Sequence, residues 1–134
     1  MSYFDILKIA STGLSAQRIR INVISSNLAN ANTTRTEDGT PYQKREVIFR
    51  TILDGELRGG VRVEKVVRDE KPPILKYEPG HPDANEEGYV AYPNINPIEE
   101  MVNMLEASRS YEANVTVLNT AKQLALKALE IGRA

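Results

Sequence analysis

Residues 96–132 read NPIEEMVNMLEASRSYEANVTVLNTAKQLALKALEIG and contain the clearest helix signal in the chain. Asn96 can cap the N-terminus, Pro97 suits the first helical position, and Glu99 stands where a capping box needs an acidic side chain. Gly132 is a residue type that commonly ends a helix. The segment therefore predicts one helix, which at 1.5 Å per residue is roughly 50 Å long and needs a packing partner.

The N-terminal segment supplies that partner, because its apolar residues recur every seven positions, as they do in a coiled-coil seam. We predict that two such rows form the intrasubunit helix seam: Leu7, Leu14, Ile21 and Leu28 against Met104, Tyr111, Leu118 and Ala125. An antiparallel pairing also brings Arg18 and Arg20 to the level of acidic residues that include Glu106. Opposite charges therefore favour the same register.

The C-terminal segment carries a second apolar stripe on a different face. It consists of Val117, Ala121, Leu124, Ala128 and Ile131. In a protein with two helices, a second stripe needs a surface outside the chain, so we assign it to an intersubunit interface. The alternative is a single wide core face in which alanine fills the gaps.

Asparagines cluster at the end of the N-terminal segment, although asparagine is a poor helix former. We assign Asn27, Asn30 and Asn32 to the intersubunit interface as well. A misaligned buried amide loses hydrogen bonds worth ~1–3 kcal/mol, so asparagine at a packed seam fixes the register. The alternative is a polar face with a frayed helix end.

Residues 35–96 differ from both helical segments in composition and pattern. They hold six of the seven prolines and six of the eight glycines, and their apolar residues show no helical period. Residues 43–53 are typical of a strand. Residues 61–67 are typical of a second strand, whose alternation slips over its last three residues as it does at a β-bulge. Residues 74–77 and 89–92 are two further short extended pieces. We predict a small β module of two or three strands with marginal stability of its own.

Together these segments predict an α+β fold in a chain of 134 residues, about the length of one domain. Long N- and C-terminal helices, in residues 1–34 and 97–134, pair antiparallel in a coiled-coil-like bundle. Residues 35–96 form a small β-rich insertion between the two helices.

Composition argues against several classes of protein. The 17 lysines and arginines nearly balance the 18 aspartates and glutamates, which is unusual for a nucleic-acid-binding protein. The chain has no cysteine, so disulfides and thiolate chemistry are excluded. No apolar run approaches the ~18–20 residues of a membrane span. The N-terminus has no basic segment followed by an apolar one, so we expect no cleavable signal peptide.

The polar cluster whose residue types best suit metal binding or acid–base catalysis is EPGHPDANEEG, residues 78–88, which contains His81, Asp83 and Glu87. A metal centre needs ligands on fixed elements, whereas this stretch holds two prolines and two glycines without a regular pattern. We therefore expect a solvated loop whose polar groups order its own turns. The sequence predicts no catalytic, cofactor-binding or metal site.

Several stretches carry a family resemblance. SNLANANTT at 26–34, after TGLSAQ at 12–17, resembles the signature shared by the bacterial flagellar axial (rod/hook) protein family. SRSYEANVTVLNTAKQLALKALEIGR at 108–133 resembles the paired C-terminal segment of that family, and GHPDANEEGYVAYPNIN at 80–96 is similar to its short proximal-rod group. In hook-type members the Asn-Thr run leads directly into a Gly-aromatic pair, whereas here residues 35–42 intervene.

The resemblance implies a structural subunit of the basal-body rod that assembles helically through its terminal helices and transmits torque, without catalysis or a cofactor. It implies export through the flagellar type III apparatus without a cleavable signal, and a place in the rod where the rod crosses the periplasm. The implied partners are other copies of the chain, the rod proteins FlgB and FlgF, the rod–ring junction protein FliE and the export apparatus. Neither nucleic-acid binding nor direct membrane insertion is implied.

The residues alone leave two alternatives open. A free-standing cytoplasmic coiled-coil adaptor that binds a partner helix predicts a discrete dimer or complex in solution. A small metal-dependent hydrolase built around His81 predicts that metal stays bound through purification.

Overall fold

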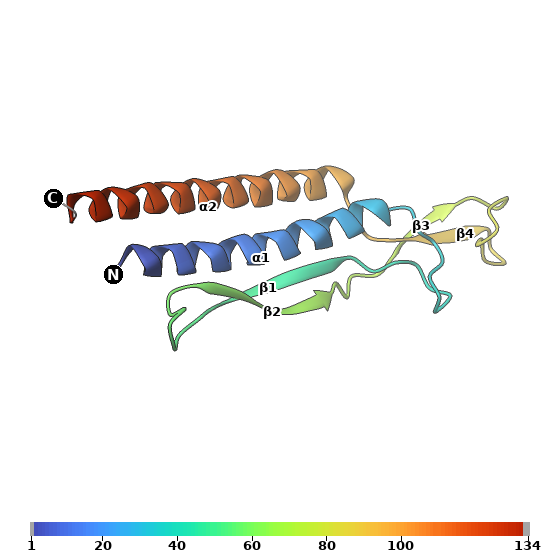
Figure 1. Ribbon diagram of the computed structural model, residues 1–134. Helices are drawn as coiled ribbons and strands as arrows, with labels where there is room; N and C mark the ends of the chain where they lie inside the picture. The colour runs from blue at the N-terminus through green and yellow to red at the C-terminus, as the bar shows by residue number, and fades with distance from the viewer. Residues whose placement is uncertain (1, 133–134) are drawn as a thin grey trace.

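The structure is a computed structural model that describes residues 2–132. The chain is elongated, and the start of its first helix lies at the same end as the finish of its last helix (Figure 1). In chain order the elements are α1 (Tyr3–Ala29), β1 (Arg45–Thr51), β2 (Val61–Arg68), β3 (Ile74–Tyr77), β4 (Tyr89–Tyr92) and α2 (Pro97–Ile131). The predicted α+β fold, with antiparallel terminal helices and a β-rich insertion, is confirmed.

Capping side chains explain where the two helices begin. At α2, Asn96 Oδ1 accepts hydrogen bonds from the backbone N–H groups of Ile98 (3.0 Å) and Glu99 (3.4 Å). At α1, Ser2 Oγ accepts from Asp5 N (3.2 Å) while Ser2 N donates to the Asp5 carboxylate (3.1 Å). The first cap agrees with the sequence prediction, and the second is a capping box that the sequence analysis missed.

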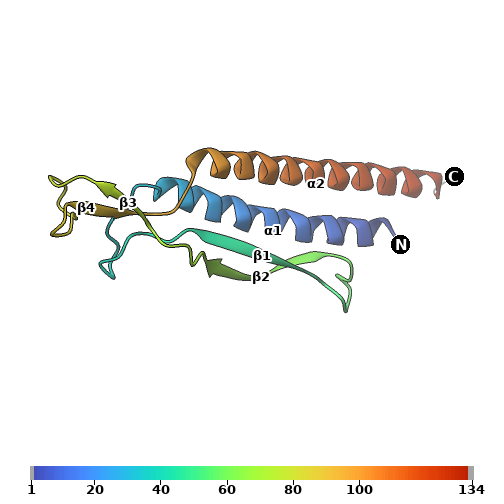
Figure 2. The same cartoon turned by 180° about the vertical axis from the view of Figure 1, so that it is seen from behind.

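Helix α1 is the middle of three layers. Helix α2 packs along one side of α1 and the β1–β2 hairpin along the other, in both views of the ribbon (Figure 1, Figure 2). The hairpin docks through Thr12, whose Oγ1 accepts a hydrogen bond from Val61 N (3.0 Å), and through an ion pair between Lys8 and Glu56 (3.3 Å). Within the described residues, α1 therefore buries two faces while α2 is covered on one.

The buried positions of the two helices are mostly small or polar. They are Ala10, Gly13, Ala16, Ile24 and Asn27 on α1, and Glu100, Ala107 and Ala121 on α2. Gly13 lies against Asn114, because a Cβ atom built on Gly13 would stand 2.8 Å from Asn114 Nδ2. Small side chains at a helix contact let the two axes approach closely. The seam is therefore centred on small and polar residues.

The rows of larger residues predicted for the seam lie beside this centre. Side chains that stay partly exposed are those of Leu7, Leu14, Ile21, Leu28, Met104, Leu118 and Ala125, and Tyr111 is 36% exposed. The antiparallel register itself agrees with the charge argument, since Arg20 Nη2 lies 3.6 Å from Glu106 Oε2. The register of the pair thus agrees with the charges, whereas the most buried residues lie next to the rows that the seven-residue period picked out.

The β insertion consists of two separate antiparallel hairpins, which corrects the prediction of one module of two or three strands. In the β1–β2 hairpin, Glu64 is the extra residue where the register shifts, a β-bulge next to the predicted slip. In the β3–β4 hairpin, Ile74 lies opposite Tyr92 and Tyr77 opposite Tyr89. The bounds of these two short strands agree with the sequence, but their pairing had to come from the structure.

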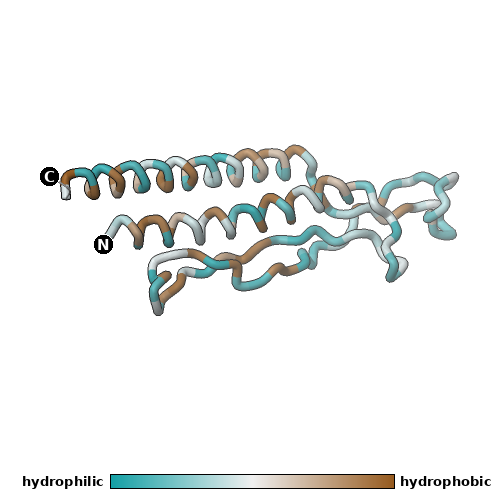
Figure 3. The backbone as a smooth tube through the Cα atoms, in the orientation of Figure 1, coloured by the Kyte–Doolittle hydropathy of each residue, from teal (hydrophilic) through white to brown (hydrophobic). Residues whose placement is uncertain are grey.

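Polar and apolar residues alternate along both helices (Figure 3). Large apolar side chains nevertheless remain exposed on them, among them Phe4 (67%), Leu105 (61%) and Leu129 (65%). Neither helix has, within the described residues, an apolar stretch long enough to cross a membrane. Exposed apolar surface of this extent is typical of a protein that packs against other proteins.

Candidate functional site: a buried polar junction and an exposed helix face

Asn27, in the last turns of α1, joins three elements through one side chain. Its Nδ2 donates to the backbone oxygen of Arg45 (2.8 Å) and to Glu100 Oε2 (3.1 Å). Its Oδ1 accepts from Tyr42 Oη (3.0 Å) and from Arg45 N (2.9 Å). The amide thus makes two hydrogen bonds as a donor and two as an acceptor. With an exposed fraction of 1%, Asn27 ties α1 to the start of β1 and to α2.

Glu100 supplies the α2 side of this contact and is also 1% exposed. Its Oε1 lies 3.2 Å from Lys44 Nζ and accepts a hydrogen bond from Asn103 Nδ2 (3.3 Å). A carboxylate can be buried only when it is paired and hydrogen-bonded, and here both oxygens are occupied. We call the cluster of Asn27, Tyr42, Lys44, Glu100 and Asn103 the Asn27 junction.

The Asn27 junction makes stability depend on pH through Lys44. Burial lowers the pKa of the Lys44 ammonium, but the hydrogen bond and charge of Glu100, together with the charges of Glu46 and Glu99, outweigh burial and raise that pKa above its ordinary value of 10.5. A raised pKa means that the ion pair contributes fully below about pH 10.5 and is lost as the pH rises through the folded-state pKa.

We therefore expect a Lys44→Arg variant to lose less stability than the wild type as the pH rises above about 10.5, because the guanidinium stays charged there. Urea denaturation at a series of pH values measures the difference between the two proteins. Titration of all other groups is shared by both, so parallel pH profiles for the two proteins would contradict the assignment.

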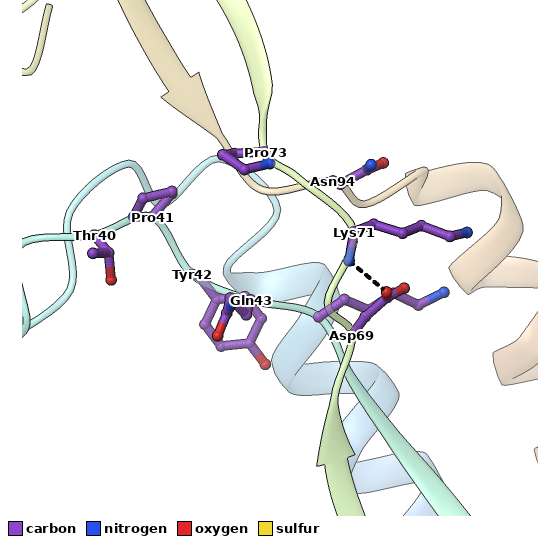
Figure 4. A pocket seen from close by; sticks show the side chains of 9 residues that line it. Thr40, Pro41, Tyr42, Gln43, Asp69, Lys71, Pro73 and Asn94 are labelled. Atoms are coloured by element: carbon purple, nitrogen blue, oxygen red, sulfur yellow. Dashed lines mark hydrogen bonds between the residues drawn. The ribbon is translucent and has the colours of Figure 1, made fainter. Parts of the chain in front are cut away.

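A pocket of about 310 Å³ opens beside the Asn27 junction, between the segments that connect α1 to β1, β2 to β3 and β4 to α2 (Figure 4). Asp69 Oδ1 accepts a hydrogen bond from Lys71 N (2.9 Å), and Asn94 Nδ2 donates to the backbone oxygen of Pro72 (3.1 Å). The polar groups at this pocket therefore hold chain segments to one another.

The polar loop of residues 78–88 orders its own turns. His81 Nδ1 accepts a hydrogen bond from Asp83 N (3.0 Å). The Asp83 carboxylate accepts from Thr34 Oγ1 (2.6 Å) and lies 3.5 Å from Arg35 Nε, so it tethers the loop to the segment after α1. Within residues 2–132, no three His, Asp or Glu side chains gather closely enough to hold a metal ion.

Most of the predicted intersubunit stripe on α2 is exposed. Val117 is 44% exposed, Leu124 46% and Ile131 78%, and Ala128 is exposed as well. Ala121 is a correction, because it is 3% exposed and lies with the buried residues of α2. We call Val117, Leu124, Ala128 and Ile131 the α2 outer stripe.

The three asparagines assigned to the intersubunit interface differ in place. Asn27 is a correction, since its side-chain hydrogen bonds are made inside its own chain. Asn30 Nδ2 donates to Ser26 O (2.9 Å) and Asn30 Oδ1 accepts from Thr33 Oγ1 (3.1 Å), so it shapes the end of α1. Asn32 is exposed.

Sequence reasoning missed the partners of Asn27. Glu100 was not singled out from the sequence, and Tyr42 and Lys44 were treated only as parts of the insertion. A signal for Glu100 was present, because it begins a seven-residue series that continues through Ala107 and Asn114. No comparable pattern marks Tyr42 or Lys44.

Two family models match the chain: one described as flagella basal body rod protein over residues 7–35, and one described as flagellar basal body rod FlgEFG protein C-terminal over residues 86–131. Curated relatives named flagellar basal-body rod protein FlgC match over nearly the whole length. The relative from Borreliella burgdorferi is 45% identical and covered over 98% of both chains. Those from Salmonella typhimurium and Bacillus subtilis are 46% and 42% identical, over 99% of this chain and 100% of theirs. These matches do not favour the cytoplasmic adaptor, and the chain belongs to the FlgC family of flagellar basal-body rod proteins.

Proposed function

We propose that the protein is a structural subunit of the flagellar basal-body rod and that it assembles helically through its terminal helices. The observation that carries this proposal is the α2 outer stripe, an apolar row on the helix that its own chain covers on one side only. The outward side of a surface helix is normally polar. The exposed apolar row of α2 departs from that pattern, as a surface that packs against another protein does.

The Asn27 junction gives this subunit a fixed shape. It holds α1, α2 and the start of β1 in one register, so that force applied to one element reaches the other two. Such a unit suits the transmission of torque, and its polar groups are engaged in structure rather than aimed at a substrate. We therefore assign it neither catalysis nor a cofactor.

Membership of the family supports several finer assignments, which we propose as well. We place the protein in the rod where it crosses the periplasm, after export through the flagellar apparatus without a cleavable signal. Its neighbours are other copies of itself, FlgB, FlgF and FliE. We also propose residues 1–34 and 97–134 as the assembling helical part and residues 35–96 as a distinct insertion, with the eight predicted seam residues flanking the contact between the helices.

The test of this function is the double variant Leu124→Asp with Ile131→Asp. We expect normal protein levels and export but no incorporation into isolated basal bodies and no motility, because two charges would be buried without partners at the interface. Immunoblots of cells, of exported protein and of purified basal bodies measure the three steps separately.

The matched control is Thr116→Asp with Gln123→Asp, which also adds two aspartates seven residues apart at exposed positions of α2, on its polar side. This control should assemble normally. Normal motility of the Leu124→Asp, Ile131→Asp variant would remove the α2 outer stripe from the interface.

A further inference from the structure

Exposed apolar side chains gather at the C-terminal end of α2. Leu126 is 52% exposed and Leu129 65%. Since Asn27 contacts Glu100 and Gly13 lies against Asn114, the antiparallel register brings the start of α1 level with residues near Leu124. The last turns of α2 therefore extend past α1, as Figure 1 shows. We call Leu126 and Leu129, which lie close together on one side of the helix, the α2 tip.

A second exposed apolar surface lies at the opposite end of the molecule, on the β3–β4 hairpin (Figure 1). Leu75 is 61% exposed, Tyr77 65% and Tyr89 40%. Tyr77 pairs directly with Tyr89, and Leu75 is two residues from Tyr77, so all three project from one face. We call these three residues the hairpin face.

The hairpin face is an ordered surface. The rings of Tyr77 and Tyr89 meet edge to face with centroids 5.3 Å apart. Gly88 has φ +89°, and a Cβ atom there would stand 2.9 Å from Tyr77 Cε1, so the Tyr77 ring rests on the glycine. On the other face of the hairpin Val90 is fully buried. An antiparallel sheet with one buried face normally turns polar residues outward, and this one turns outward a leucine and two tyrosines.

The two ends carry complementary charge. The loop between β3 and β4 holds Glu86 and Glu87, both exposed, and residues 78–88 contain no lysine or arginine. The end of α2 carries Lys122 and Lys127, both exposed, against Glu130. An acidic rim beside one apolar surface and a basic excess beside the other favour their association and disfavour contact of either end with itself.

We propose that the hairpin face binds the α2 tip of a second copy of this chain. The two surfaces belong to one chain and lie at its opposite ends, so they meet only between copies. Each contact leaves one hairpin face and one α2 tip free, so the contact is head-to-tail and propagates instead of closing a dimer. The inference rests on the proposed function and specifies which surfaces of the subunit meet.

The experiment uses thiol crosslinking, because the chain contains no cysteine. Full-length Glu87→Cys, Lys127→Cys and the double variant replace the chromosomal copy, and isolated basal bodies are treated with a short bismaleimide. We expect covalent dimers and larger multiples of the chain from the double variant alone, because each contact needs one thiol at the hairpin of one copy and one thiol at the α2 tip of the next. The control pair Glu64→Cys with Lys127→Cys moves the acidic position to the other hairpin and should stay monomeric.

Each other outcome has a defined meaning. Dimers from a single-cysteine variant would show that the same end of two copies is in contact, and they would overturn the proposal. Crosslinks to a protein of different mass would mean that another rod component, and not a second copy of this chain, contacts these surfaces. That result would also overturn the proposal. A double variant present in basal bodies but not crosslinked would overturn this contact and leave the proposed function standing. Absence of the wild-type chain from basal bodies would overturn both.

Discussion

Replacing Asn27 by alanine is expected to lower the free energy of unfolding by about 3 kcal/mol or more. The substitution removes the partner of one buried oxygen of Glu100 and of the part-buried backbone groups of Arg45, and an unpaired buried group costs about 1–3 kcal/mol. Small domains are stable by about 5–15 kcal/mol in total, so the variant loses a large share. Urea denaturation followed by circular dichroism measures the change.

Asn22→Ala is the matched control, because Asn22 stands on the same helix and is exposed. Its effect should stay within about 0.5 kcal/mol, as for most surface substitutions. Asn27→Asp keeps the shape of the side chain but replaces a donor to Glu100 by a second carboxylate, so it should be at least as destabilising at neutral pH. An Asn27→Ala protein as stable as the wild type would contradict the central role given to this amide.

The features of this fold that could be predicted from the sequence are those set by neighbouring residues. Asn96 and Gly132 mark the two ends of α2 because a cap acts within one helical turn. The bounds of β3 and β4 followed from short extended runs between turn residues. In these places the local preference and the final structure agree, so one window of sequence was sufficient.

The pairing of the strands was harder, because it depends on contacts between distant residues. The sequence suggested one module, whereas β3 pairs with β4 at one end of the molecule and β1 with β2 along α1. Thr12 shows why, since its hydroxyl accepts from the backbone of Val61, far along the chain, and holds the first hairpin on the helix. No pattern in the sequence around a helical threonine indicates that it will anchor a distant hairpin.

The phase of the helix seam was missed for a different physical reason. Large aliphatic residues such as Leu14 dominate any hydrophobic period, but a close helix contact is made where side chains are small, as at Ala107. A polar residue can also occupy the centre when its hydrogen bonds are satisfied, as for Glu100. Two of its partners, Asn27 and Lys44, come from the last turns of α1 and from the segment before β1, so no pattern within α2 reveals them.

Replacing Gly13 by valine is expected to lower the free energy of unfolding by about 1–3 kcal/mol, the usual cost of overpacking a tight contact. A Cβ atom at Gly13 would stand 2.8 Å from Asn114 Nδ2 and 3.0 Å from Asn114 Cγ, so the whole amide is in the way. Ser25→Val is the control for the helix preference of valine, since Ser25 is exposed on the same helix. Urea denaturation of both variants measures the cost of the contact.

A second substitution separates this clash from a general weakening of α1. Asn114→Ala removes the amide, whose own hydrogen bond runs only to the Ser110 carbonyl one turn earlier (3.1 Å), so by itself it should cost little. In the double variant Gly13→Val with Asn114→Ala, the introduced methyl groups occupy the space that the amide leaves, and we expect about 1–2 kcal/mol of the loss to return. The same rescue should restore assembly, because the α2 outer stripe is presented to neighbours only when α2 lies in its native register on α1. A double variant no more stable than Gly13→Val alone would show that Gly13 is needed for a reason other than the close approach of the two helices.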